Sequence, residues 1–368
     1  MNNNTIFKII DSVDLFLSNE RYLMVYYMNS RQRKSFKVNE YMIHLLELID
    51  GIKPLSQLKD LMSSAYSISE DEVEAVIESM VENHILTEVK QINILSGEDQ
   101  ARFTRQINYF SEFLGSEEAG HIAQKKLFVA KVLIFGCGAI GGDIAVELAM
   151  AGIRNITLFD IDTVEDSDVS RHIYYKNEYT GMKKTEALKK HLEAIDHKMN
   201  IQVLNQYLSP ADEIEGLIKQ HDFIVNTLDE PYIGYTSAKI SRLCIRNNLP
   251  HFIAGGFDAH LASTGELIIP FVTPCAECYA DYFKVTLKDW KPKTHPVKVR
   301  YKKIGGLSSM SLFSASYAAI EIVKTITGLI DMGASFKVRG ELLFDDYSLT
   351  YLNVKRNPAC PVCGENNR

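Results

Sequence analysis

The chain has 368 residues, of which 46% are hydrophobic and 24% charged, and its formal net charge is −7. These proportions are ordinary for a globular protein, and the acidic balance disfavours nucleic acid as a partner. No apolar run approaches the roughly 18–20 residues that a membrane span needs, and residues 1–5 lack the layout of a signal peptide, so we expect a cytoplasmic protein with no membrane partner.

The first 93 residues have a pattern of their own. Two β-rich runs (14–16 and 22–28) are followed by three helical patterns (39–48, 56–65 and the segment after Ser69) and by a last strand at 85–89. Ser69 begins S-E-D-E, a capping-box sequence. This order predicts a winged-helix-like module over residues 1–93. A polar connection at 96–100 leads into a second domain, which we place at 94–368.

From residue 131 onward the pattern alternates between buried strands and helices. We expect strands at 132–135, 156–159, 201–208, 223–227 and 252–254, with helices between them, as at 143–150. The alternation predicts an α/β fold, a doubly wound Rossmann-type sheet.

A glycine-rich loop follows the first of these strands. Gly136, Gly138 and Gly141 form G-x-G-x-x-G between a strand and a helix, where backbone N–H groups can contact a phosphate. Asp160 ends the next strand about 20 residues later, where an acid would bind ribose hydroxyls. These residues alone predict a nucleotide site, and a dehydrogenase would have them too.

Charged residues farther along indicate a triphosphate. Arg171 and Lys184 follow the second strand, and Asp229 follows the fourth. Hydride transfer does not need them, whereas cleavage of a triphosphate needs cations at the phosphoryl oxygens and a carboxylate for Mg²⁺. The pattern therefore favours ATP and disfavours a dehydrogenase.

Four of the six cysteines form two C-x-x-C pairs, Cys275/Cys278 and Cys360/Cys363. In a cytosolic chain this spacing is typical of metal binding rather than of disulfides. Four thiolates would hold Zn²⁺ with no position open for water, which predicts a structural site. The alternative is a set of unpaired surface cysteines.

In this order, and together with an R-F-T-R-Q-I segment at 102–107, these motifs resemble the ThiF/MoeB-type adenylating family, the relatives of ubiquitin-activating enzymes. The resemblance implies a homodimer that uses ATP, Mg²⁺ and Zn²⁺. By this resemblance, Asp160 would bind the ATP ribose. Arg171 and Lys184 would contact the triphosphate, and Asp229 would hold the Mg²⁺. Arg105 would act in trans as an arginine finger on the neighbouring subunit's phosphates.

Two acidic positions are open to more than one interpretation. Asp162 either contacts the nucleotide or only shapes a turn. Asp168 stands where the family usually has Asn, so it would lie near the triphosphate and either share the metal or alter the geometry.

Some family members pass the activated acyl group to a cysteine, but no cysteine occurs between Tyr279 and Ala359. We therefore expect direct use of the adenylate. The basic segment 284–303, with Trp290, is interpreted as a cover over the site, a substrate contact or a solvated loop.

The module at 1–93 resembles PqqD-like elements, which hold a leader peptide as an added strand. The whole arrangement is similar to the peptide-modifying branch of the family, which matures antibiotics such as microcin C and pantocin A. We expect adenylation of a carboxylate, with a glutamate side chain as one candidate, on a ribosomal precursor peptide. The alternatives are activation of a Gly-Gly-terminated sulfur-carrier or ubiquitin-like protein, a tRNA-modifying dehydratase, which the acidic balance disfavours, and a nucleotide sensor, which the retained Arg105, Arg171 and Asp229 disfavour.

Overall fold

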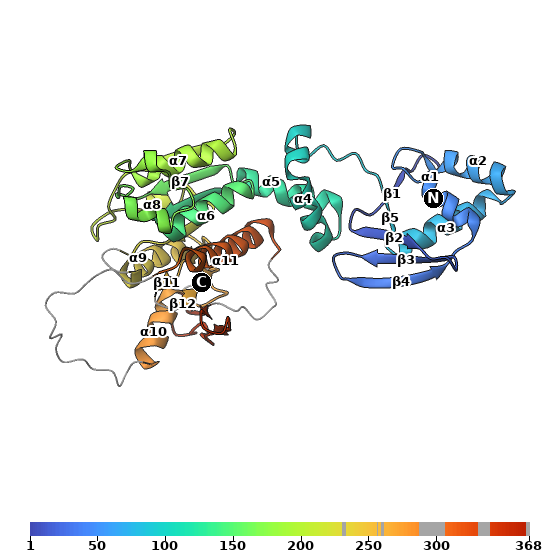
Figure 1. Cartoon of the computed structure of the whole chain (residues 1–368). Coiled ribbons are helices and arrows are strands. Elements are labelled where there is room, and N and C mark those ends of the chain that lie inside the picture. Colours follow the sequence, from blue (N-terminus) through green and yellow to red (C-terminus); the bar gives the residue numbers. More distant parts are fainter. Residues whose placement is uncertain (230–232, 256, 259–260, 287–305, 330–338, 366–368) are drawn as a thin grey trace. The chain divides into compact units, whose positions relative to one another are not determined.

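The structure is a computed structural model that describes residues 1–229, 233–255, 257–258, 261–286, 306–329 and 339–365. The chain divides into two compact units, Met1–His121 and Ile122–Arg368, drawn in Figure 1. The helix α5 (Glu117–Val129) crosses the division. That residues 1–93 form a domain by themselves stays a prediction. Trp290, with residues 287–303 of the basic segment, lies outside the described residues.

The first unit combines two small antiparallel sheets with helices. The strands β2, β3 and β4 form one sheet in that order, and β1 pairs with β5. The bounds are β1 (Phe7–Ile9), β2 (Val13–Leu17), β3 (Tyr22–Tyr27), β4 (Gln32–Lys37), α1 (Glu40–Leu48), α2 (Leu55–Tyr66), α3 (Glu70–Glu82), β5 (Leu86–Glu88) and α4 (Gly97–Leu114). The three helical patterns expected from the sequence before residue 93 are confirmed as α1, α2 and α3.

Local capping explains where two of these helices begin. The Asn39 side chain accepts the Met42 N–H at 3.1 Å at the start of α1. At the start of α3, Ser69 and Glu72 form the reciprocal capping box that the sequence predicts. A single core, which includes the fully buried Val25 and Leu45, joins the β2–β3–β4 sheet to α1, α2 and α3.

The second unit contains a six-stranded sheet in the order β13-β10-β9-β6-β7-β8. All its neighbouring strands are parallel except β13, which runs antiparallel to β10. The bounds are β6 (Lys131–Phe135), β7 (Asn155–Phe159), β8 (Asn200–Leu204), β9 (Phe223–Asn226), β10 (His251–Ile253) and β13 (Glu266–Ile268). This strand order confirms the doubly wound Rossmann-type sheet.

Helices follow the strands in two directions. From β6 the chain moves through α6 (Ala139–Met150) to β7 and through α7 (Lys184–Ile195) to β8, and from β9 it moves the other way through α9 (Ile233–Arg246) to β10. Because such crossovers are right-handed, α6 and α7 lie on the opposite face from α9. The short α8 (Glu215–Ile218) packs with α9 over Leu133, Phe135 and Ile224.

A second, antiparallel sheet has the order β11-β12-β14-β15. Its strands are β11 (Phe257–Asp258), β12 (Leu261–Ser263), β14 (Gly340–Leu343) and β15 (Leu349–Tyr351), and the remaining helices are α10 (Ala276–Thr286) and α11 (Ser308–Thr327). The long α11 packs along α6. Among the described residues, no helix is both long enough and apolar enough to cross a bilayer.

Candidate functional site

The strand order places a crevice at the carboxyl ends of β6 and β9. These strands are neighbours, and the chain leaves them toward opposite edges of the sheet, which is the point where doubly wound folds bind ligands. The segments that follow β6, β9 and the adjacent β7 begin at Gly136, Thr227 and Asp160. The sequence-predicted nucleotide residues of these three segments are therefore brought to one edge of the sheet.

The three glycines of the loop differ in what surrounds them. Gly136 has φ +92°, and a Cβ there would lie 2.3 Å from the Thr227 Oγ1. A Cβ on Gly141 would lie 2.0 Å from the Gly136 carbonyl oxygen. A Cβ on Gly138, the residue before α6, would meet no described atom within 4 Å. Packing thus requires Gly136 and Gly141, while Gly138 borders open space at the helix N-terminus, where a phosphate can bind.

Asp160 ties the end of β7 to the glycine loop. Its side chain is buried, and its Oδ2 accepts the Cys137 N–H at 2.6 Å, while its Oδ1 accepts the Asp162 N–H at 2.7 Å. Each carboxylate oxygen has a second lone pair. Asp160 can therefore hold the loop and still accept a hydrogen bond from a ribose hydroxyl.

Lys184, the first residue of α7, is held beside these acids. Its Nζ lies 3.0 Å from the Asp162 Oδ2, and the residue is 9% exposed. Burial lowers the pKa of Lys184, but the bond to Asp162 and the charges of Asp160, Asp162 and Asp168 outweigh it and raise the pKa above its usual value. The ammonium group is therefore charged at neutral pH.

Asp168 is fully buried and holds Arg171. Its Oδ1 accepts Nε (3.0 Å) and Nη2 (2.7 Å) of Arg171, and its Oδ2 accepts the Glu165 N–H at 3.0 Å. Burial raises the pKa of Asp168, but these bonds and the nearby cations lower it overall. The Arg171 side chain remains about half exposed, at 46%. Asp168 thus fixes an arginine that still faces solvent.

Two aromatic rings, those of His172 and Tyr174, lie behind this pair, and no sequence pattern points to Tyr174. His172 stacks on Tyr174 with ring centroids 5.1 Å apart, and the Tyr174 hydroxyl donates to the Cys137 carbonyl at 2.6 Å. Burial lowers the pKa of His172 to about 4, so the imidazole is neutral. Tyr174 also packs against Gly142, since a Cβ there would lie 2.4 Å from its ring. It therefore supports the glycine loop from 37 residues away in sequence.

Asp143 is a buried acid on α6 that the sequence analysis also missed. Its Oδ1 accepts the Ile173 N–H at 3.2 Å, and its Oδ2 has no hydrogen-bond partner among the described residues. Burial raises the pKa of Asp143 to about 7.

The segment after β9 is anchored to the same loop. Thr227 Oγ1 donates to the carbonyls of Phe135 (2.9 Å) and Gly136 (3.2 Å), and Asn226 accepts the Leu228 N–H at 3.2 Å. Asp229 follows and is exposed. The exposed carboxylate of Asp229 therefore lies on a segment fixed to the glycine loop, and no partner for it occurs among the described residues.

Arg105 lies elsewhere in the chain. It is exposed on α4, in the first unit, whereas the residues described above belong to the second.

The four cysteines of the C-x-x-C pairs come together as predicted. All are buried, and their sulfur atoms lie within 4.8 Å of one another. Individual Sγ–Sγ distances are 3.9 Å (Cys275–Cys278), 3.7 Å (Cys275–Cys360) and 3.5 Å (Cys278–Cys363). A tetrahedral ion with metal–sulfur bonds of about 2.3 Å requires sulfur separations of about 3.8 Å. The cluster could therefore hold a metal ion.

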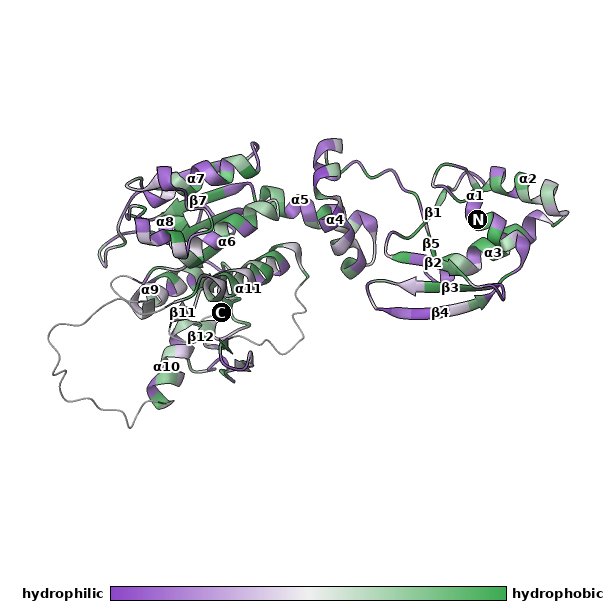
Figure 2. Cartoon of the chain, viewed as in Figure 1, coloured by the Kyte–Doolittle hydropathy of each residue, from purple (hydrophilic) through white to green (hydrophobic). Residues whose placement is uncertain are grey.

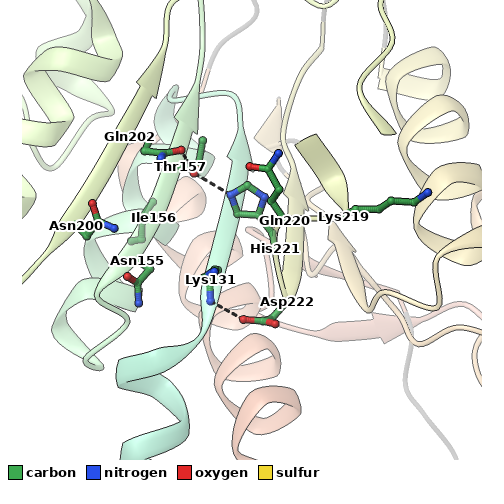
Figure 3. Close-up of a pocket in the computed structure, with 10 residues that line it drawn as sticks. All are labelled: Lys131, Asn155, Ile156, Thr157, Asn200, Gln202, Lys219, Gln220, His221 and Asp222. Atoms are coloured by element: carbon green, nitrogen blue, oxygen red, sulfur yellow. Dashed lines mark hydrogen bonds between the residues drawn. The ribbon is translucent and has the colours of Figure 1, made fainter. Parts of the chain in front are cut away.

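A pocket of about 460 Å³ lies at the opposite end of the strands from the crevice (Figure 3). Lys131, Asn155 and Asn200, the first residues of β6, β7 and β8, are among those that line it. In this pocket His221 contacts the Thr157 hydroxyl through Nε2 (2.8 Å), and its Nδ1 lies 2.9 Å from the Leu217 carbonyl. Both ring nitrogens of His221 therefore already have partners. Because the pocket lies at the opposite end of the strands from the crevice, we assign it no part in the nucleotide site.

Comparison with known proteins identifies the family of the chain. The ThiF family matches residues 103–362. Similar proteins include the vegetative HesA of Trichormus variabilis, 29% identical over 68% of this chain and 86% of its own. The molybdopterin-synthase adenylyltransferase of Escherichia coli is 25% identical over 74% of this chain and 99% of its own.

Solved structures share the fold over a longer stretch. E. coli MccB with ATP matches at a TM-score of 0.66 and 22% identity over 97% of this chain and 99% of its own. PaaA matches at a TM-score of 0.72 and 22% identity over 94% and 100%. The family match covers most of the sequence and includes the glycine loop and three of the four paired cysteines, and the chain therefore belongs to the ThiF family of adenylyltransferase-type enzymes.

Proposed function

We propose that the chain transfers AMP from ATP to a carboxylate of a ribosomally made precursor peptide, as a step in the maturation of a peptide antibiotic of the microcin C or pantocin A kind. The observation that carries the proposal is the extent of the fold likeness. It covers 97% of this chain and 99% of MccB, which has been solved with the peptide MccA. The E. coli molybdopterin-synthase enzyme leaves about a quarter of this chain unmatched.

The nucleotide would lie across the carboxyl ends of β6, β7 and β9. The N–H groups around Gly138 would contact a phosphate, and Asp160 would accept a ribose hydroxyl. Lys184 and Arg171 are charged groups already fixed by Asp162 and Asp168, so they would neutralise the triphosphate with little rearrangement.

The reaction would be displacement at the α-phosphorus. A carboxylate oxygen of the peptide forms the new P–O bond, and the bond to the leaving pyrophosphate breaks. Asp229 would hold the Mg²⁺ that neutralises the phosphate oxygens, since an exposed carboxylate suits this hard cation. The substrate carboxylate is already ionised at neutral pH, so no general base is needed. Catalysis would come from positioning and electrostatic stabilisation. A glutamate side chain of the precursor is one candidate for this carboxylate.

We assign the cysteine cluster to a structural Zn²⁺. All four sulfurs are buried and would occupy every position of a tetrahedral ion, which leaves none for water or substrate. Two backbone N–H groups lie 3.4 Å from the sulfurs, Asn357 N–H at Cys278 and Val362 N–H at Cys360, and would stabilise thiolates. The ion would fix the C-terminal segment to the start of α10.

The precursor's leader would bind the first unit as an added strand. In the β2–β3–β4 sheet, β2 and β4 each have one edge that pairs with no other strand among the described residues. The two edges differ, because β4 is rich in Arg and Lys while β2 is largely apolar, as their colours in Figure 2 show. Free strand edges of this kind accept extended peptides through backbone hydrogen bonds.

We also propose a homodimer in which Arg105 reaches the phosphates bound by the neighbouring subunit. Arg105 is exposed on α4 and would be available to a second chain. Mixing two inactive variants, Arg105→Ala and Asp229→Ala, tests this directly. Regained AMP formation in the mixture is expected if Arg105 acts in trans, and a mixture that stays inactive would contradict it.

A second candidate is activation of a sulfur-carrier protein. Relatives named as adenylyltransferase and sulfurtransferase, such as bovine MOCS3 at 26% identity, favour it. The same crevice residues would serve both reactions, so the substrate must be decided by experiment.

The deciding measurement is the release of AMP and pyrophosphate from ATP with two partners in parallel. One partner is a short peptide encoded beside the gene, and the other is a carrier protein ending in Gly-Gly. Release that depends on the peptide, with a change in the peptide's mass, is the expected result. Release that depends only on the carrier protein would replace the proposal with the second candidate.

A further inference from the structure

The segment that follows β8 lies next to the proposed ribose position. The phosphates would lie at the glycine loop after β6 and the ribose at Asp160, after β7, and β8 is the next strand in the same direction. The Asp160 N–H donates to the carbonyl of Leu204, the last residue of β8, at 3.1 Å. Since the base and the phosphates leave a ribose on opposite sides, the base would extend to the residue after Leu204, which is Asn205.

The side chain of Asn205 is held by the first turn of α7. The hydroxyl of the fully buried Thr185 donates to the Asn205 Oδ1 at 2.5 Å. Thr185 directly follows Lys184, whose backbone N–H donates to the Asp162 carbonyl at 3.0 Å. The Asn205 amide is therefore directed toward the helix start that also presents Lys184 to the crevice.

This amide keeps hydrogen-bonding capacity for a ligand. Its Oδ1 accepts one bond from Thr185 and has a second lone pair. Its Nδ2 group has no hydrogen-bond partner among the described residues, and Asn205 is exposed. The side chain therefore offers an acceptor and a donor side by side, in an orientation that a buried hydroxyl fixes.

Adenine has the matching pair of groups, and guanine does not. In adenine the 6-amino group donates and the adjacent ring nitrogen accepts, so a carboxamide can pair with both at once. Guanine has an oxygen at position 6, which would meet Oδ1 as a second acceptor. A fixed carboxamide at this position therefore favours ATP over GTP.

Apolar side chains are exposed on both segments that border this position. Ile161 directly follows Asp160 and is 40% exposed, and Tyr207 lies two residues after Asn205 and is 47% exposed. Apolar and aromatic groups of this kind can cover the faces of a base while a polar group contacts its edge.

We propose that Asn205 selects adenine as the base of the nucleotide, with its Oδ1 accepting the 6-amino group and its Nδ2 donating to the adjacent ring nitrogen. Thr185 holds the amide in the required orientation. The inference goes beyond the choice of the adenylated carboxylate, because it concerns which nucleotide binds. It rests on the proposed function only in placing the ribose at Asp160.

The test measures the Kd of ATP and of GTP by calorimetric titration of the full chain with Mg²⁺ and without any peptide or carrier protein. The variant is Asn205→Asp, which keeps an acceptor for Thr185 and for the 6-amino group of adenine but loses the Nδ2 donor. Its carboxylate can instead accept the ring N–H and the 2-amino group of guanine. The control is Asn200→Asp, because Asn200 is exposed at the opposite end of β8. Since both side chains are exposed, both variants should keep the melting temperature of the unmodified chain.

We expect the unmodified chain and Asn200→Asp to bind ATP about tenfold or more tightly than GTP, and Asn205→Asp to reduce this ratio about tenfold. The added charge of Asn205→Asp repels both triphosphates equally and cancels in the ratio. GTP binding as tightly as ATP to the unmodified chain would overturn the inference. So would an Asn205→Asp variant that keeps the ratio of the unmodified chain.

Because the titration needs no acceptor substrate, this inference and the proposed function fail separately. If the ratio changes as expected but no peptide is adenylated, the assignment of Asn205 stands and the peptide substrate falls. If a peptide is adenylated but the ratio is the same in Asn205→Asp, the function stands and the assignment of Asn205 falls.

Discussion

At the scale of single residues, the cationic side chains of the crevice are fixed in position by neighbouring acids before any nucleotide binds. Lys184 is fixed by Asp162, and Arg171 by the buried Asp168. A carboxylate at position 168 holds Arg171 more strongly than the uncharged amide of an Asn would. Such fixed charges need little reorganisation when negative charge develops on the phosphates, which is the main source of electrostatic catalysis.

Asp229 is the residue for which we expect the largest loss of activity. Asp229→Ala should reduce AMP formation by about a hundredfold or more, because the Mg²⁺ would lose its protein ligand. Steady-state release of AMP measures the effect. Since Asp229 is exposed, the melting temperature and the metal content of the cysteine cluster should not change. Turnover that survives the substitution would remove Asp229 from the mechanism.

Asp143 predicts a pH dependence of stability. Burial raises its pKa from 3.8 to about 7, so the unfolded chain releases this proton near pH 4 and the folded chain only near pH 7. Between these values the folded state binds the extra proton, and the free energy of unfolding therefore falls as the pH rises. The loss has an upper limit of about 4 kcal/mol. Asp143→Asn should remove it.

Thermal melts at pH 5.5 and pH 8.5 check this. The unmodified protein should lose stability at the higher pH by more than Asp143→Asn does. Other titrating groups affect both proteins equally and cancel in the comparison. The control is Asp60→Asn, since Asp60 is exposed on α2. An Asp143→Asn variant with the same pH dependence as the unmodified chain would show that the buried acid is not the cause.

At the scale of elements, features set by neighbouring residues could be predicted from the sequence, and features set by contacts between distant residues could not. The capping box at Ser69 and the glycine loop depend on neighbouring residues, and both are where the sequence placed them. The strand β4, Gln32–Lys37, was missed because its charged residues hide the alternation of an edge strand, and the polar helix α4 was also missed.

Element bounds and supporting contacts also needed the structure. The helix α6 begins at Ala139, four residues before the expected start, because the glycines of the loop continue into its first turn. The strand β8 ends at Leu204 rather than at residue 208. Tyr174 and Thr227 support the loop from far away in sequence, and no local pattern points to them.

The glycine loop gives a prediction that separates folding from binding. Gly138→Ala should fold normally, because its Cβ would meet no described atom and its φ of −75° suits any residue. It should nevertheless weaken ATP binding about tenfold or more, since the methyl group enters the phosphate space.

Gly141→Ala is the matched variant. Its Cβ would lie 2.0 Å from a backbone oxygen, so it should lose about 2 kcal/mol or more of stability. Calorimetric titration with ATP and thermal melts of both variants provide the comparison. Normal ATP affinity in Gly138→Ala would mean that the phosphates bind elsewhere.

The cysteine cluster predicts one zinc ion per chain. Cys363→Ala should lose the ion and about 3 kcal/mol or more of stability, because three thiolates bind Zn²⁺ far less tightly than four and the C-terminal segment is released. Elemental analysis and thermal melts measure both effects. Cys244→Ala is the control, since Cys244 is buried in a different cluster and should leave the zinc content unchanged. Purified protein without zinc but of full stability would contradict the assignment.

At the scale of the whole molecule, the chain joins a family domain to a unit that the family match barely touches. The ThiF match begins at residue 103, and all the sheets of the first unit precede it. The residues proposed to bind the nucleotide within a single chain all lie in the second unit. Binding of ATP and binding of a leader peptide should therefore be separable by truncation.

Removal of residues 1–90 tests this separation. The truncated chain lacks β1–β5 and α1–α3 and with them both free edges of the β2–β3–β4 sheet, so its affinity for the precursor peptide should fall by about tenfold or more. Its affinity for ATP should stay within about twofold of the full chain's, and that value also shows that the second unit is folded. Fluorescence anisotropy of a labelled peptide and calorimetry with ATP give the two constants. Because the peptide's reacting residue would still contact the crevice, some weak binding is expected to remain. An unchanged peptide affinity would refute leader binding by the first unit and would favour the sulfur-carrier alternative, in which these residues have no part in substrate recognition.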